Sequence, residues 1–353
     1  MKRAADTFLF YLGHPAHYHN VSVVIQQLSA KGYNIVLVAR AKDVLFELLE
    51  GLPYKIIYLK PKKGKGKISL IATVVKREFV LYRIALKYKP KMFIGTDIVI
   101  THVSRLLGIP SVILNEDDAI EVPFLAKFGF KYATAVFSPN CCDISPYQNK
   151  KIGYNGYHEL AYLHPNYFTP DKTKIQELFK NGSTYFILRF AELTAHHDKG
   201  KKGIDLAVAK KLVEKLTPFG EVIITSERKL EPELEQYRIK INPKNIHHAL
   251  AFAQIYIGDS QTMAAEAAVL GTPSIRFNDF AGRLGYLDEL EHKYQLTCGI
   301  STDNPQALFD KVDEMLKDKS IRQTFEKRKE IMLKNCVDVA QLWINYFIEN
   351  SKK

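Results

Sequence analysis

Strand-like and helix-like patterns alternate along almost the whole chain, and this alternation limits the folds that the chain can adopt. Short apolar or β-branched runs such as 34–39 and 111–114 alternate with stretches of helical apolar spacing such as 18–30 and 98–107. Strands that alternate with helices form βαβ units around a parallel sheet. We therefore expect an α/β protein.

The elements predicted from these patterns fill both halves of the chain. The expected strands are 7–12, 34–39, 54–59, 92–95, 111–114, 135–137, 185–190, 221–225, 255–257 and 273–277. The expected helices are 18–30, 41–50, 68–88, 98–107, 124–132, 204–216, 245–253, 261–270, 304–317, 321–332 and 337–348.

A chain of 353 residues is too long for one ordinary core. A stretch rich in Pro, Gly and Tyr, residues 138–171, interrupts the alternation, and we interpret it as the connection between two domains. We expect two Rossmann-like doubly wound domains that face a cleft, over residues 1–165 and 166–335. A C-terminal helix within 336–353 is expected to pack back on the first domain.

The apolar runs, the cysteines and the net charge disfavour several classes of protein. No apolar run approaches the ~20 residues that span a bilayer. The first apolar run, 7–12, is interpreted as a strand and not as part of a signal peptide. The four cysteines form no CxxC pair, which indicates reduced thiols in a cytoplasmic protein. The net charge of +12 favours an anionic partner, but no nucleic-acid-binding signature is present, so we expect no nucleic acid.

The loop after the first strand, residues 13–20, holds three histidines. Gly13 permits a close backbone approach, and the start of the following helix offers N–H groups to an anion. His14 and His17 can exchange protons near neutral pH. We expect catalysis or ligand binding here. The alternatives are a helix cap and a metal site formed by His17 with His19.

The most informative segment is 257–273, where a strand ends at Gly258 and a helix begins with Asp259 or Ser260 as N-cap. The helix is almost entirely small or apolar, so we expect it to be buried. Glu266 inside it needs a hydrogen-bonding partner. The hydroxyls of a bound ribose would supply one, and an internal Arg, Lys or backbone amide is the alternative.

Ser260, Glu266, Gly271, Pro273 and Arg276 resemble the C-terminal nucleotide-binding motif of UDP-N-acetylglucosamine 2-epimerases and related glycosyltransferases of the GT-B fold. Three other segments resemble the DUF354 family of that superfamily still more closely, and the likeness covers about residues 6–335. These segments are 13–19, 39–45 and 154–163.

The resemblance implies the GT-B fold and a UDP-type nucleotide on the second domain. Glu266 would bind the ribose, and Ser260, Gln261 and Thr262 would meet the pyrophosphate. Ser226 and Arg228, which follow a strand, would line the base or phosphate pocket. The remaining residues expected to bind the nucleotide-sugar are Arg189, His197 and Arg276, of which Arg189 and His197 would neutralise the leaving diphosphate. The epimerases carry His-Arg-Arg-Glu-Asn where this chain has 196–199, and this departure disfavours epimerisation.

Carboxylates follow two strands of the first half: Asp97 after 92–95, and Glu116 and Asp117 after 111–114. They are candidate general bases. Asp97 is also a candidate N-cap for the helix 98–107. No recognised acidic metal motif is present, so we expect no metal.

These residues predict a glycosyltransferase-like enzyme that uses a UDP-sugar donor in the synthesis of cell-surface polysaccharide or glycolipid. His14 or one of the carboxylates would deprotonate a glycan or lipid-linked acceptor. No cofactor is expected besides the UDP-sugar substrate. The alternatives are an epimerase and a non-catalytic nucleotide-sugar-binding protein.

Five lysines lie in the run Lys60–Lys67, ahead of a helix that carries Phe79, Leu81, Tyr82 and Ile84. A basic loop beside such a helix predicts peripheral attachment to an anionic membrane surface. A solvated loop is the alternative.

Overall fold

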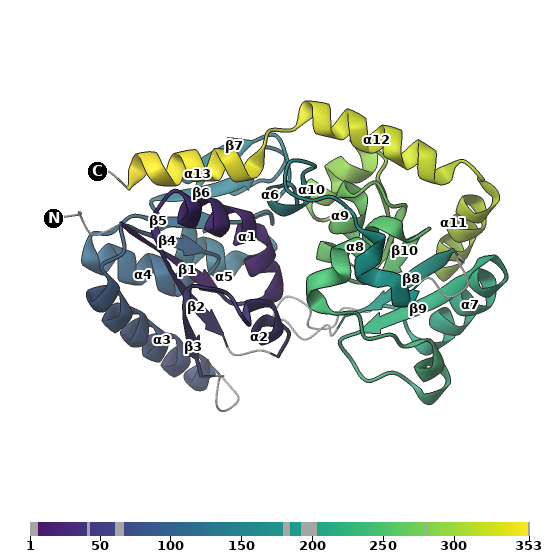
Figure 1. Cartoon of the computed structure of the whole chain (residues 1–353), viewed down its shortest axis with the longest axis horizontal. Coiled ribbons are helices and arrows are strands. Elements are labelled where there is room, and N and C mark those ends of the chain that lie inside the picture. The colour runs from purple at the N-terminus through teal and green to yellow at the C-terminus, as the bar shows by residue number, and fades with distance from the viewer. Residues whose placement is uncertain are drawn as a thin grey trace. The chain divides into compact units, whose positions relative to one another are not determined.

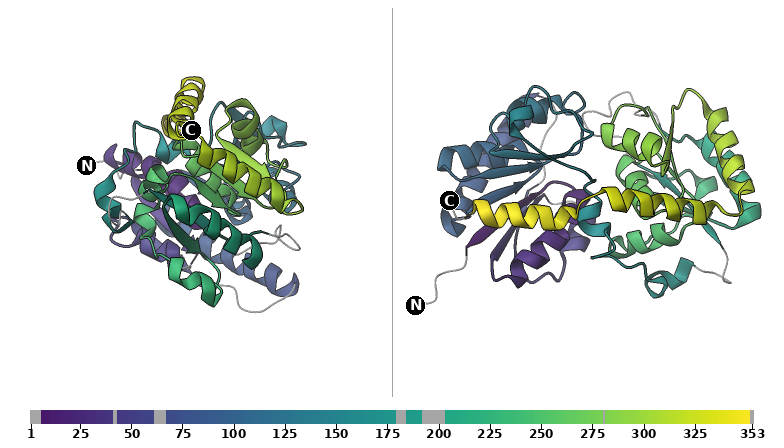
Figure 2. Two further views of the ribbon diagram at one scale, coloured as in Figure 1. Left: turned by 90° about the vertical axis from the view of Figure 1, so that its right-hand side faces the viewer. Right: turned by 90° about the horizontal axis from the view of Figure 1, so that it is seen from above.

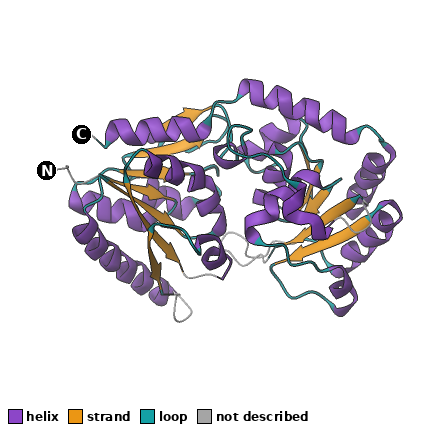
Figure 3. Ribbon diagram, viewed as in Figure 1, coloured by secondary structure: helices purple, strands orange, loops and turns teal. Residues whose placement is uncertain are grey.

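The computed structural model describes residues 6–40, 43–60, 67–178, 184–191, 203–279 and 281–351. The chain divides into two compact units, which are described separately (Figure 1). The first unit comprises residues 1–167 and 337–353, and the second comprises residues 168–336. Each unit consists of a sheet and the helices that cover it (Figure 3).

The first unit contains a sheet of seven parallel strands in the order β3-β2-β1-β4-β5-β6-β7. The strands are β1 (Thr7–Leu12), β2 (Asn34–Arg40), β3 (Lys55–Leu59), β4 (Met92–Gly95), β5 (Ser111–Leu114), β6 (Ala135–Pro139) and β7 (Lys151–Tyr154). The helices are α1 (Pro15–Ala30), α2 (Asp43–Leu49), α3 (Lys67–Tyr88), α4 (Ile98–Leu107), α5 (Pro123–Leu125), η1 (Ala126–Phe130), η2 (Gln148–Lys150), α6 (Leu160–Leu163) and α13 (Val339–Asn350).

Strand β1 is buried along its whole length because helices cover both faces of the sheet. Leu9 and Tyr11 belong to a core cluster with residues of α3 and α4. Phe8 points the other way, where its ring centroid lies 6.5 Å from that of Phe347 on α13. This arrangement explains why the strand is a continuous apolar run and not an alternating one.

Helix α13 lies far from the rest of the first unit in sequence, yet it packs on α1 and α6 (Figure 2). Trp343 and Phe347 of this helix are fully buried. The ring of Trp343 lies 6.3 Å from that of Phe137 on β6. The end of the chain therefore contributes to the core of the unit with which the chain begins.

The second unit contains five parallel strands in the order β12-β11-β10-β8-β9. They are β8 (Tyr185–Phe190), β9 (Glu221–Ser226), β10 (Tyr256–Gly258), β11 (Ser274–Phe277) and β12 (Thr297–Ile300). Its helices are η3 (Lys172–Leu178), α7 (Leu206–Leu216), η5 (Thr217–Phe219), η6 (Pro232–Tyr237), η7 (Pro243–Asn245), α8 (Ile246–Phe252), α9 (Gln261–Val269), α10 (Gly285–Asp288), η8 (Glu289–Lys293), α11 (Pro305–Lys317) and α12 (Ile321–Asn335).

The chain passes from the first unit to the second at Tyr167, inside the stretch 138–171 that we interpreted as the connection between domains. The same stretch also contains β7 and α6, which were not expected. Strand β12 was also not expected. Both strands are four residues long, stand at the edge of a sheet and are only partly buried, so neither gives the apolar signal of an inner strand. Among the described residues, no helix is both long and apolar enough to cross a bilayer.

Candidate functional site

Each sheet has a point where the strand order reverses. In the first unit the reversal lies between β1 and β4, and in the second it lies between β8 and β10. Ligands of open α/β sheets bind outside the carboxyl ends of the strands at such points. His14 and Asp97 follow β1 and β4, while Arg189 and Ser260 stand at the ends of β8 and β10. The predicted residues therefore gather at the two expected edges.

Asp97 is held by two partners. Its Oδ1 accepts a hydrogen bond of 3.0 Å from the Val99 N–H, so Asp97 is the N-cap of α4. Its Oδ2 accepts a hydrogen bond from Arg40 at the end of β2. Both carboxylate oxygens of Asp97 are thus engaged within the first unit. Asp97 therefore positions α4 and Arg40, and its predicted role as a general base stays a prediction.

Tyr11 and Gly13 complete the surroundings of Arg40. The Arg40 guanidinium lies 5.9 Å from the centre of the buried Tyr11 ring. Burial raises the pKa of Tyr11, and the charge of Asp97 adds to this effect. A Cβ on Gly13 would stand 3.5 Å from both the Arg40 guanidinium and the His17 ring, so this loop packs directly against the arginine.

The two predicted histidines of this loop have local roles in the structure. His14 is the exposed N-cap of α1, and its Nδ1 accepts a hydrogen bond of 3.3 Å from the Ala16 N–H. His17 Nδ1 accepts one of 3.2 Å from the Gly13 N–H. The capping alternative is thus present in the geometry. Within the described residues, no group of three or more His, Cys, Asp or Glu side chains could hold a metal ion.

Glu116 meets a histidine that sequence reasoning did not single out. Its Oε2 accepts a hydrogen bond of 3.3 Å from the His158 N–H and lies 3.5 Å from His158 Nδ1. Asn20 of α1 also lies 3.3 Å from this nitrogen. Burial lowers the pKa of His158 to about 3, so the imidazole is neutral at pH 7. Its ring lies edge-on to Trp343 at 5.1 Å.

Asp117 is partly exposed next to Glu116, and its carbonyl accepts a hydrogen bond of 2.5 Å from the Asn115 side chain. Glu116 and Asp117 both follow β5, so the two carboxylates stand at the carboxyl edge of the first sheet as predicted.

In the second unit, Arg189, Gly258, Arg276 and Gly299 stand side by side in register across four strands. Side chains in register on parallel strands share one face. Arg189 forms an ion pair with Glu227. Arg276 is fully enclosed, and its Nη2 lies 2.8 Å from Glu291 Oε2. Arg276 has no exposed surface in this structure, and its predicted contact with the nucleotide stays a prediction.

Asp259, at the end of β10, was expected only as an alternative N-cap. In the structure the cap is Ser260, and Asp259 accepts hydrogen bonds from the Ala191 N–H at 2.6 Å and the Ile204 N–H at 3.3 Å. Burial raises the pKa of Asp259 to about 6, in spite of these two bonds. Asp259 therefore links Ala191, which follows β8, to Ile204, which precedes α7. The predicted His197 lies outside the described residues.

The other residues predicted to bind phosphate lie at the carboxyl ends of β9 and β10. Ser260 Oγ accepts a hydrogen bond of 3.4 Å from the Met263 N–H, and Gln261 and Thr262 are partly exposed in the first turn of α9. Ser226 Oγ accepts one of 3.1 Å from the Arg228 N–H. The Arg228 guanidinium lies over the Phe190 ring at 5.2 Å. Among these residues, the start of α9 is best suited to an anion.

Glu266 is 3% exposed, and its Oε1 lies 3.0 Å from Nε2 of His247 on α8. The buried carboxylate thus has an internal partner, as one alternative required, although the partner is a histidine and not Arg, Lys or a backbone amide. The predicted ribose contact stays a prediction.

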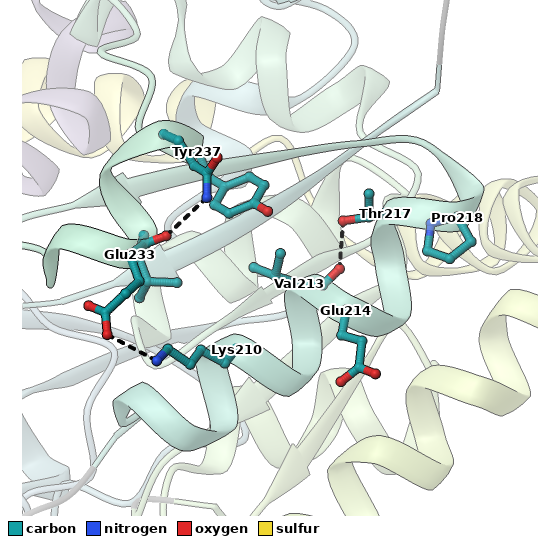
Figure 4. Close-up of a pocket in the computed structure, with 9 residues that line it drawn as sticks. Lys210, Val213, Glu214, Thr217, Pro218, Glu233 and Tyr237 are labelled. Carbon is teal, nitrogen blue, oxygen red and sulfur yellow. Dashed lines mark hydrogen bonds and ion pairs between the residues drawn. The ribbon is translucent and has the colours of Figure 1, made fainter.

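A cavity of about 560 Å³ lies between α7 and η6 in the second unit (Figure 4). Lys210 and Glu233, which form an ion pair of 3.0 Å, belong to its lining. No predicted site residue lines this cavity, so it is separate from the candidate site.

A family model described as "Protein of unknown function (DUF354)" matches residues 10–338. The chain belongs to the DUF354 family. The predicted resemblance is thereby confirmed, and two of the segments that carried it contain Arg40 and His158, the partners of Asp97 and Glu116. No curated protein sequence matches this DUF354 chain.

Solved structures share the fold of the DUF354 protein over nearly its whole length. A putative UDP-N-acetylglucosamine 2-epimerase from Listeria monocytogenes has a TM-score of 0.67 at 14% identity and covers 92% of this chain and 91% of its own. The spinosyn forosaminyltransferase has a TM-score of 0.64 at 13% identity and covers 99% and 100%. The UDP-GlcNAc 2-epimerase from Neisseria meningitidis, bound to UDP-GlcNAc, has a TM-score of 0.59 at 15% identity and covers 93% and 99%. The predicted α/β class and GT-B fold are confirmed.

Proposed function

We propose that the protein is a glycosyltransferase-like enzyme that binds a UDP-sugar at the carboxyl edge of its second sheet. The observation that carries this proposal is the reversal of strand order between β8 and β10, where Arg189 and the start of α9 lie together. Similar structures include glycosyltransferases and an epimerase bound to UDP-GlcNAc, which supports a nucleotide-sugar as the ligand.

The diphosphate of the donor would lie at the start of α9. Within the described residues, the backbone N–H groups of Gln261 and Thr262 have no hydrogen-bond partner. Such groups, together with the positive end of the helix dipole, stabilise the negative charge of a leaving diphosphate. Arg189 and Arg228 add positive charge near this position, and no metal ion is needed for this step.

The first unit would supply the acceptor site and the base. The acceptor hydroxyl attacks the anomeric carbon of the sugar, the bond to the diphosphate breaks, and the hydroxyl proton passes to the base. The candidates are His14, Glu116 and Asp117. Because His14 Nδ1 accepts a backbone N–H, proton transfer by His14 would use Nε2.

The biological setting belongs to the same proposal. The acceptor would be a glycan or lipid-linked molecule of the cell surface, and the protein would act in the cytoplasm. The lysine run Lys60–Lys67 would attach it to the inner face of the membrane, although residues 61–66 lie outside the described part of the chain.

Epimerisation at C2 of a UDP-sugar is the second candidate, because two of the similar structures are UDP-N-acetylglucosamine 2-epimerases. A protein that only binds a nucleotide-sugar is the third. One experiment separates the three: UDP-, GDP-, CMP- and dTDP-sugars are screened by thermal shift, since a bound ligand raises Tm. The best ligand is then incubated with the protein and analysed for free nucleotide and for the C2 epimer.

Release of UDP that depends on an added acceptor supports transfer. Formation of the epimer replaces the first candidate with the second, and stable binding without either product favours the third. If no UDP-sugar raises Tm, the proposed donor site is wrong.

A further inference from the structure

Helix α3 of the first unit exposes a strip of large apolar side chains to solvent. The four side chains recur at steps of four and seven residues and therefore lie along one side of the helix. They are Ile71, Val75, Phe79 and Leu86, with exposed fractions of 64%, 57%, 62% and 52%. We call this set the α3 strip.

The α3 strip is separate from the side of the helix that faces the core. Leu81 and Ile84 of the same helix are 0% and 8% exposed and pack in the core cluster of the first unit. The inward side of α3 already fills the core, so the outward strip contributes nothing to it. A contiguous exposed apolar surface of this kind on a soluble domain marks an interaction site.

Basic residues form one edge of the α3 strip. Lys76, Arg83 and Lys87 are exposed and lie on the helix next to Val75 and Leu86. The helix contains a single acidic residue, Glu78, which is paired with His102 of α4. The exposed part of α3 is therefore apolar on one edge and positively charged on the other.

Neighbouring helices of the same layer add apolar surface. Helices α3 and α4 pack side by side (Figure 1), and α4 packs on η1. Leu106 of α4 is 73% exposed. Phe124 and Phe128 are 53% and 37% exposed, and the Phe128 carbonyl lies 2.8 Å from His102 Nε2.

We propose that the α3 strip binds the surface of an anionic lipid bilayer, with α3 lying parallel to the membrane plane. An apolar strip beside Lys and Arg matches the boundary between acyl chains and anionic headgroups. From Ile71 to Leu86 the strip extends about 22 Å in a straight line, at 1.5 Å per residue, which suits a plane better than a pocket. The excess of 50 Lys and Arg over 38 Asp and Glu draws the whole chain toward such a surface.

This inference adds a second contact to the membrane attachment that the proposed function assigns to the lysine run. It does not depend on the donor site, because no donor-site residue is involved. It also differs from the expectation based on the lysine run, since it rests on described residues of α3. The two ideas are distinguished by variants that leave every lysine of the run in place.

The test is co-sedimentation of the full chain with vesicles of phosphatidylglycerol and phosphatidylcholine in equal parts, and with vesicles of phosphatidylcholine alone. We expect wild type to bind the anionic vesicles more tightly. The double variant Val75→Glu/Phe79→Glu should lose at least about tenfold in affinity, because two apolar contacts are replaced by charges that the surface repels. The triple variant Lys76→Gln/Arg83→Gln/Lys87→Gln should lose roughly 100-fold at low salt.

Matched controls are Phe219→Glu and Ile331→Glu, which change apolar residues of the second unit that are both 55% exposed. They should bind vesicles like wild type. All variants should keep the thermal unfolding curve and UDP affinity of wild type, since every altered side chain is exposed.

Three results would overturn the proposal. They are the absence of anionic vesicle binding by wild type, equal binding by the Val75/Phe79 variant, and equal losses in the controls. A wild-type dimer in light scattering that the Val75/Phe79 variant converts to monomer would instead assign the α3 strip to a second copy of the chain. UDP binding is measured separately, so failure here leaves the proposed donor site standing. An absence of anionic vesicle binding by wild type would also contradict membrane attachment by the lysine run.

Discussion

His247 of α8 and Glu266 of α9 form a hydrogen bond of 3.0 Å between two helices of the second unit, and both side chains are buried. A buried carboxylate is tolerated only when it is hydrogen-bonded. The pair therefore fixes the orientation of the one acidic side chain in an otherwise small and apolar helix. That helix begins at the proposed diphosphate site, so the orientation of Glu266 bears on stability and on ligand binding.

Replacement of Glu266 by Ala should reduce both the stability of the protein and its affinity for the ligand. Loss of the hydrogen bond leaves His247 without this partner and should lower the free energy of unfolding by about 1–3 kcal/mol. If Glu266 also binds the ribose, UDP affinity in calorimetry should fall roughly 10- to 150-fold. Glu266→Gln keeps the shape of the side chain and is the control. Destabilisation with unchanged UDP affinity would remove Glu266 from the nucleotide site.

Asp97→Asn should keep the N-cap of α4, because an amide oxygen can still accept the Val99 N–H. Asp97→Ala should lose it, at a cost of about 0.5–2 kcal/mol in urea unfolding. Since Asp97 is held by Arg40, we expect Asp97→Asn to retain turnover within about tenfold of wild type. A loss of turnover near the ~10²–10⁴-fold typical of a general base would instead support the predicted role of Asp97 as that base.

His158 should make the protein sensitive to acid. Its pKa of about 3 in the folded state is below the ordinary value of 6.5, so the unfolded chain binds the extra proton first. The stabilisation is complete above pH 6.5 and is lost as pH falls toward 3, at about 1.4 kcal/mol per pH unit. His158→Gln should remove this slope from the wild-type curve in urea unfolding at several pH values. Parallel curves for the two proteins would contradict the buried neutral histidine.

The contribution of Asp259 to stability should depend on pH in the opposite sense to that of His158. Its pKa is raised from 3.8 to about 6, so the folded protein retains the proton longer than the unfolded chain. This contribution to stability falls as pH rises from about 4 to 6 and is constant above that range. Asp259→Asn should remove the slope. The single amide oxygen cannot replace both carboxylate oxygens that accept the Ala191 and Ile204 N–H groups, so Asp259→Asn should also lower the free energy of unfolding at pH 7 by about 1 kcal/mol in urea. Equal stability of the two proteins at pH 7 would contradict a structural role for these two bonds.

The sequence was sufficient to predict the inner strands and the longer helices. Strands β4 and β5 and helix α4 have the predicted bounds, because each is a short buried run between clear turn or capping signals. Helix α1 begins at Pro15, earlier than predicted, because His14 caps it and Pro15 fits the first helical position. The edge strands β7 and β12 were missed because an edge strand needs less apolar sequence.

The partners of the site residues could not be predicted in this way. Arg40 and Asp97 are 57 residues apart, and His158 and Glu116 are 42 apart. These residues come together at one edge only because of the order of the strands in the sheet. The spacing of apolar residues along the sequence does not predict that order. The resemblance had marked the segments with Arg40 and His158 as family features, but it gave no physical reason for them.

The chain leaves the first unit at Tyr167 and returns to it at Val337. A ribosome therefore completes the second unit, residues 168–336, before it makes α13. Until Trp343 and Phe347 emerge, the aromatic side chains of Phe8 and Phe137 lack the partners that cover them in the finished protein. The first unit is therefore the first to be started and the last to be completed in synthesis. In a chain that stops before α13, all residues of the second unit would be present, but the first unit would lack the side chains that bury part of its core.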